Sequence, residues 1–297
     1  MNRKHIWGRL ALWGTAFLWG TSFVLLKATL DSVGVLWILA LRFLGAAALL
    51  ALAAGKKLLR LDRRSFIGSV LMGLSLAAAY IFQTYGLFHT TPGKNAFLTA
   101  VYCVLVPFLA WLVYKRRPKP IHVIAAALCL CGIGFVSLDS LDNGFNIGDL
   151  LTLICGFFYA LQIIIMEHYV ADGQSNAVSV SAVQFGTSAL ICLAGALLFE
   201  TFPRGLSLSA WLNIAYLSAV VTGLCFFLQA VGLQYTPSST ASVILVFESV
   251  FGVLTSLLFY GERMTLKLAL GFVLIFFSVL LSEAGEDWLA KRQSKSV

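Results

Sequence analysis

Long apolar segments fill most of this 297-residue sequence. A helix needs roughly 20 apolar residues to cross the hydrocarbon core of a bilayer, which is about 30 Å thick. Ten segments meet this length, at residues 9–30, 34–54, 66–88, 92–114, 120–138, 147–167, 178–199, 208–232, 237–259 and 265–283. Because the connections are short, no room is left for a soluble catalytic domain. We therefore expect an all-α integral membrane protein with ten transmembrane helices.

The composition agrees with this expectation. Hydrophobic residues make up 60% of the chain, charged residues only 11%, and the mean hydropathy is +0.90. A soluble domain would carry about 25% charged residues. The first apolar segment lacks an A-x-A-like cleavage site, so we expect it to be a true span and not a removed signal peptide.

The basic residues are unevenly placed. Fifteen of the 21 Lys and Arg residues lie before the first span, after the second and fourth spans, or in the C-terminal tail. An alternating ten-span topology puts all of these segments on one side of the membrane. Because cytoplasmic loops carry the excess of Lys and Arg, we expect both termini in the cytoplasm and the protein in the cell (plasma or inner) membrane. Orientation thus explains the net charge, and we expect no nucleic-acid partner.

Sequence motifs for catalysis and metal binding are missing. The four histidines form no H-E-x-x-H, no G-x-S-x-G occurs, and GKKLLR does not fit the phosphate-binding pattern G-x-x-x-x-G-K-[ST]. All six cysteines lie in predicted spans, and Cys129 and Cys131 are spaced so that they face different sides of a helix. We therefore expect no enzyme activity, no metal site and no cofactor.

The two halves of the chain repeat the same order of residues. Residues 82–108 align with residues 228–253 after one gap, and the first span aligns with the sixth. The matched pairs are Gln83 with Gln229, Gly86 with Gly232, Ala96 with Ala241, Trp19 with Tyr159 and Lys27 with Glu167. We infer one repeat at residues 1–140 and a second at residues 141–284, followed by a cytoplasmic tail at residues 285–297.

An odd number of spans in each half means that the second copy enters the membrane from the opposite side. The loops after the seventh and ninth spans are accordingly nearly free of excess positive charge, unlike their basic counterparts in the first half. Inverted repeats are typical of secondary transporters, whose substrate site lies near the membrane midplane between the halves. We expect two inverted five-helix repeats around a central cavity.

Several short motifs follow this repeat. They are WGTSF at 19–23, ALRF at 40–43, the run from Gln83 to Thr99, VYCVLVPFLA at 101–110, GDLLTL at 148–153, TPSSTASVILVFES at 236–249 and YGE at 260–262. In this order they resemble the drug/metabolite transporter superfamily, specifically its ten-helix EamA-type exporters. Two positions depart from the family pattern: Ser249 replaces a proline, and Arg116-Arg117 stands where the second half has Gly-Glu.

The resemblance implies a basket of helices around a central cavity, with the fifth and tenth spans at the periphery. It also implies export of small metabolites, such as amino acids, or of xenobiotics. Alternating access in a secondary transporter is therefore the first hypothesis for function. A passive pore, or a membrane sensor or scaffold that transports nothing, is the alternative.

Two charged residues lie deep within spans. Glu248 and Arg42 fall at nearly the same depth, and a buried charge in a membrane usually pairs with another. Three interpretations of Glu248 stay open. It forms a structural ion pair with Arg42, it faces the cavity to bind an amino group or carry a coupling proton, or it stays protonated because burial favours the neutral carboxyl.

Amide and aromatic side chains complete the set of candidate site residues. Gln83, Gln162 and Gln229 either line the cavity or bridge helices, as amides in spans often do. Trp19, Tyr102 and Tyr159, with Tyr80, either form an aromatic wall that binds planar or cationic ligands or simply pack in the core. The three glutamines, with Trp19, Tyr102, Tyr159, Glu248 and Arg42, form the predicted substrate-binding site. The expected partners are a small-molecule substrate and the lipid bilayer.

Overall fold

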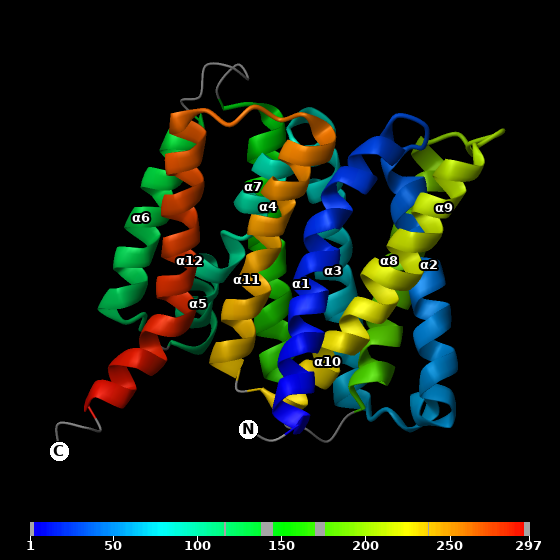
Figure 1. Ribbon diagram of the computed structural model, residues 1–297. Coiled ribbons are helices and arrows are strands. Elements are labelled where there is room, and N and C mark those ends of the chain that lie inside the picture. The colour runs from blue at the N-terminus through cyan, green and yellow to red at the C-terminus, as the bar shows by residue number, and fades with distance from the viewer. Residues whose placement is uncertain (1–2, 116, 138–144, 170–175, 237, 294–297) are drawn as a thin grey trace.

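The computed structural model describes residues 3–115, 117–137, 145–169, 176–236 and 238–293, and every regular element in these ranges is helical (Figure 1). The first half contains α1 (Arg3–Leu30), α2 (Val35–Ala54), the short η1 (Gly55–Arg60), α3 (Arg63–His89), α4 (Pro92–Thr99), α5 (Tyr102–Tyr114) and α6 (Pro120–Ser137). The second contains α7 (Ile147–Tyr169), α8 (Ala177–Phe199), α9 (Leu208–Tyr216), the π-helix η3 (Leu217–Leu224), α10 (Cys225–Tyr235), α11 (Ser238–Thr255), the π-helix η4 (Ser256–Tyr260) and α12 (Leu266–Gln293).

The length and composition of these helices fit a multi-pass membrane protein. Within the described ranges, seven helical stretches are long and apolar enough to cross a membrane. Three shorter apolar helices lie at Pro120–Val136, Ile244–Tyr260 and Leu266–Ser282. An all-α membrane fold is thus confirmed, while the count of ten spans stays a prediction.

Helices of the first half of the chain pack against helices of the second half. α3 packs along α7, and α1 packs along α10 and α11. α2 packs on α8, and α6 packs on α12 at one edge of the bundle (Figure 1). The start of α1 and the end of α12 lie at one end of the bundle, which we call the termini-bearing end, and we call the other the opposite end (Figure 1).

Close helix contacts depend on two matched glycines. A Cβ on Gly86 of α3 would collide with the side chain of Thr152 and the carbonyl of Gly148 on α7. A Cβ on Gly232 of α10 would likewise collide with Leu12 of α1. Small residues allow helices in membranes to approach closely. The pair matched in the sequence therefore makes equivalent contacts in each half.

The helix between Pro92 and Tyr114 breaks at residues 100–101, where α4 ends and α5 begins. Tight i→i−3 bonds, such as the one from the Val101 amide to the Leu98 carbonyl (3.3 Å), replace the α-helical pattern there. Pro107 lies further along, inside α5, and cannot donate to the Cys103 carbonyl. The Ser282 hydroxyl of α12 donates to that carbonyl instead (3.2 Å). A side chain of the neighbouring helix α12 thus donates to the carbonyl that proline leaves without a backbone partner.

Candidate functional site

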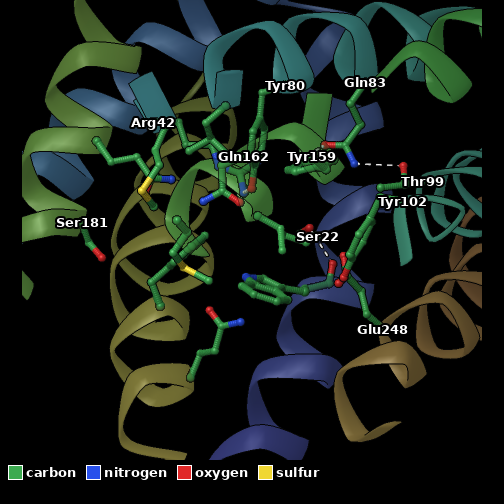
Figure 2. A pocket seen from close by; sticks show the side chains of 18 of the residues that line it. Ser22, Arg42, Tyr80, Gln83, Thr99, Tyr102, Tyr159, Gln162, Ser181 and Glu248 are labelled. Carbon is green, nitrogen blue, oxygen red and sulfur yellow. Dashed lines mark hydrogen bonds between the residues drawn. The ribbon is translucent and has the colours of Figure 1, made fainter. Parts of the chain in front are cut away.

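A cavity of about 720 Å³ lies at the centre of the bundle, between helices from both halves (Figure 2). Its lining reaches the termini-bearing end at Met166, which is 42% exposed, and at the exposed Ala177. Towards the opposite end, the lining stops at Leu26 and Gln83, which are buried. The cavity is therefore open at one end of the bundle and closed at the other.

All of the predicted site residues line this cavity. They are Trp19, Arg42, Gln83, Tyr102, Tyr159, Gln162, Gln229 and Glu248. Tyr80, expected in the aromatic wall, lines it too. Residues absent from the predicted set also line it, among them Ser22, Met72, Thr99 and Gln184. Helical spacing could have found some of them, because Ser22 lies three residues after Trp19, on the same helix face.

Arg42 is fixed by contacts with two other helices. Its side chain is only 2% exposed, and its Nε donates to the Thr222 hydroxyl at 2.7 Å. One terminal nitrogen donates to the Tyr80 hydroxyl at 3.4 Å, and the guanidinium carbon lies 4.8 Å from the centre of the Tyr80 ring. These contacts leave guanidinium donors free to bind an anionic group in the cavity.

The π-helix η3 lies beside the cavity and is held there by side chains from the first half. The Thr222 hydroxyl, which accepts from Arg42, donates to the Leu217 carbonyl five residues earlier (2.9 Å). The Trp19 indole nitrogen donates to the Val221 carbonyl at 2.9 Å, and the Trp19 ring contacts Phe226 at 5.4 Å between centroids. Wide turns of this kind occur frequently at functional sites.

Three tyrosines and one glutamine form a polar aromatic wall on α3, α5 and α7. The Tyr159 ring lies 5.6 Å from the Tyr80 ring and 5.9 Å from the Tyr102 ring, between centroids. The Tyr159 hydroxyl donates to the Gln83 side-chain oxygen at 3.3 Å, and the Gln83 nitrogen donates to the Thr99 hydroxyl at 3.1 Å (Figure 2). These mutual hydrogen bonds fix the orientation of the wall.

Glu248 lies on α11, on the other side of the cavity from Arg42 (Figure 2). Among the described residues, none hydrogen-bonds to its carboxylate, whereas Arg42 bonds Thr222 and Tyr80. Arg42 nevertheless acts on Glu248 electrostatically across the space. Among the described residues the two groups therefore form no direct ion pair, which was one of the three interpretations of Glu248. They flank the cavity with opposite charges.

Three further glutamines place amides around the cavity. Gln162 and Gln229 line it from α7 and α10, and Gln184 lines it from α8. The Gln184 side chain is 3% exposed, and its nitrogen has no hydrogen-bond partner within the described part of the chain. An unsatisfied buried donor is costly, so this amide is available to a bound ligand. Among the same residues, no group of three His, Cys, Asp or Glu side chains is arranged to hold a metal ion.

The chain is similar to known proteins over most of its length. The EamA-like transporter family matches it at residues 6–138 and again at 146–283. An uncharacterized transporter of Archaeoglobus fulgidus is 32% identical over 228 residues, which cover 71% of this chain and 66% of that protein. The uncharacterized transporter YwfM of Bacillus subtilis is 28% identical over 188 residues, covering 61% and 60%. Each match spans less than two thirds of the relative's length.

A solved structure has a similar fold. A protein crystal structure with 18% sequence identity aligns with a TM-score of 0.67, over 93% of this chain and 96% of that chain. At that identity, the likeness concerns the fold alone.

Proposed function

The chain belongs to the EamA-like transporter family, and we propose that it is a secondary transporter that exports small metabolites or xenobiotics by alternating access. One observation carries the proposal. A central cavity with room for a small molecule holds a carboxylate, Glu248, and a guanidinium, Arg42, on opposite sides, each with free bonding capacity. Charged groups inside a membrane protein are costly and mark substrate or ion pathways.

The cavity favours substrates that carry both an amino group and an anionic group. An ammonium would bind Glu248 and a carboxylate would bind Arg42, because each ligand group carries the charge opposite to that of the protein group. The aromatic wall of Tyr80, Tyr102 and Tyr159 would contact an apolar or planar side chain. Amino acids and related compounds have this chemistry.

The helix contacts support two inverted repeats as the basis of alternating access. In the alignment of the halves, α3 corresponds to α10 and α1 corresponds to α7. The contact of α3 with α7 in one half therefore corresponds to the contact of α10 with α1 in the other. We infer that rocking of one half against the other opens the cavity to each side in turn. From the positive-inside pattern we infer that the termini-bearing end faces the cytoplasm, which would open the cavity of this conformation to the cytoplasm.

Flux through right-side-out and inverted vesicles tests this function. We expect saturable transport of labelled amino acids, lipophilic cations or nucleobases, compared with and without a pH gradient. Glu248→Gln should reduce the rate at least about tenfold, because a charged hydrogen bond contributes about 1.5–3 kcal/mol. The control is Asp31→Asn, since Asp31 is an exposed carboxylate away from the cavity.

The outcomes separate the alternatives. Loss of saturable flux in Glu248→Gln, with normal flux in Asp31→Asn, supports a transporter with Glu248 at the site. Flux that never saturates supports a passive pore. No flux of any compound, from protein that is monodisperse and helical, contradicts the proposal and favours a sensor or scaffold. An effect of the pH gradient that disappears in Glu248→Gln would assign Glu248 a proton-carrying role.

A further inference from the structure

At the opposite end of the bundle, the loop after η4 places a carboxylate on the start of α4. Glu262 accepts a hydrogen bond from the Gly93 amide at 3.1 Å and from the Thr91 hydroxyl at 2.5 Å. The Ser256 hydroxyl also donates to it, at 2.5 Å. The Glu262 carboxylate thus joins the second half of the chain to the N-terminus of a helix in the first half.

A second carboxylate at the same end makes an equivalent contact. Glu200, at the end of α8, accepts from the backbone amides of Leu36 and Trp37 at 3.0 and 3.1 Å. These amides belong to the first turn of α2, whose own N-cap residue, Gly34, provides no capping side chain. The Tyr85 hydroxyl lies 3.5 Å from the same carboxylate.

Both contacts are electrostatically favourable and both cross between the halves. The N-terminus of a helix has free amides and a partial positive charge, so a carboxylate there is stabilising. When the opposite end opens, the two halves must separate, and both carboxylates lose these partners. We call the contacts of Glu200 and Glu262 the carboxylate clamp.

The termini-bearing end has the reverse charge at the position related to Glu262. Tyr114-Lys115 ends α5, and Tyr260-Gly261 ends η4. Lys115 and Gly261 both have left-handed backbones, with φ of 59° and 73°. Arginines follow Lys115 at positions 116 and 117, and in the alignment of the two halves Arg117 is the counterpart of Glu262.

A second pair shows the same reversal. Lys27, at the end of α1, donates to the carbonyls of Leu87 and Phe88 at 2.6 and 3.0 Å, where the C-terminus of α3 favours a cation. Its counterpart in the second half is Glu167. Closing the termini-bearing end in the same way would place an arginine at a helix N-terminus and a glutamate at a helix C-terminus, and both are unfavourable.

We propose that Glu200 and Glu262 form a gate-closing clamp, and that its absence at the termini-bearing end makes the conformation open at that end the resting state. This inference rests on the proposed alternating access and deepens it. It assigns the two glutamates as positioning residues, because they act on the equilibrium between conformations and do not line the cavity. Transport would therefore be asymmetric although the two halves are repeats.

Thiol accessibility measures this equilibrium without any substrate. Ser22→Cys places a reporter in the cavity lining, and a membrane-impermeant maleimide is applied from either side of the vesicle. With the clamp intact, we expect labelling from the termini-bearing side only. Adding Glu262→Gln or Glu200→Gln should raise the labelling rate from the opposite side about tenfold or more, the factor expected for losing a charged hydrogen bond.

Further variants control for folding and for background. Ser256→Ala removes one donor to Glu262 and should give a smaller rise in the same direction. Asp31→Asn, an exposed carboxylate at the same end, should leave the labelling rate unchanged. Protein with Ser22 intact gives the background from the six natural cysteines.

Two results would overturn the clamp: unchanged opposite-side labelling in both folded glutamine variants, or an equal rise in Asp31→Asn. Flux is measured separately on the same vesicles. Unchanged labelling with normal saturable flux contradicts the clamp and leaves the transporter standing. Changed labelling with no flux of any compound supports a two-state gate and contradicts the proposed transport.

Discussion

At the scale of single residues, the site consists of polar groups that the surrounding helices hold in place. Arg42 is the clearest case, since a buried guanidinium needs partners and finds them in Thr222 and Tyr80. Glu248 differs, because no described residue hydrogen-bonds to it. The side chain of Arg42 is thus held in place, whereas the described residues leave the carboxylate of Glu248 open to a ligand.

Thr222→Val tests the support of Arg42. The substitution keeps the shape of the side chain but removes the acceptor of the Arg42 Nε and the donor to the Leu217 carbonyl. We expect about 1–3 kcal/mol lower stability and at least a severalfold lower transport rate. The matched control is Thr187→Val, since the Thr187 hydroxyl bonds only within its own helix. Thermal unfolding and flux, measured on both variants, check this. Equal behaviour of the two would show that Thr222 does not position Arg42.

At the scale of helices, the sequence predicts more of the lining than of the backbone irregularities. Polar residues in apolar spans point to the cavity, because lipid-facing positions would exclude them. The break at residues 100–101 and the π-helix η3 leave no such signal. They depend on distant contacts, such as the bond from Trp19 to Val221. The contacts of Glu200 and Glu262 with the helix N-termini of the first half are not predictable either, although Glu262 stands in the YGE motif, because charged residues in loops are ordinary and only the fold shows what they touch.

Gly86→Ala tests the close packing of α3 on α7. The added methyl group would meet the Thr152 side chain and the Gly148 backbone carbonyl, and the backbone cannot move aside cheaply. Overpacking of this kind typically costs about 1–3 kcal/mol. Gly186→Ala on α8 is the control, because nothing lies within 4 Å of its Cβ position. Thermal unfolding in detergent should show a loss for Gly86→Ala and none for Gly186→Ala.

At the scale of the whole molecule, the charge pattern and the mouth of the cavity predict which compartment the cavity faces. The basic loop that contains Lys57 lies at the termini-bearing end of the bundle. The mouth of the cavity, near Met166, lies at the same end. An exporter must collect its substrate from the cytoplasm. If the basic end faces the cytoplasm, as the positive-inside rule predicts, the proposed export requires a resting state open to that end, and the proposed carboxylate clamp would favour it.

Cysteine mapping of both ends tests this orientation. Lys57→Cys lies at the termini-bearing end, and Arg204→Cys lies in the exposed loop between α8 and α9 at the opposite end. Because basic loops stay in the cytoplasm, an impermeant maleimide should label Arg204→Cys on intact cells and Lys57→Cys only in inverted vesicles. The natural protein gives the background labelling. The reverse pattern would place the open cavity outside, so that the clamp would hold the site facing the exterior, the resting state that uptake requires.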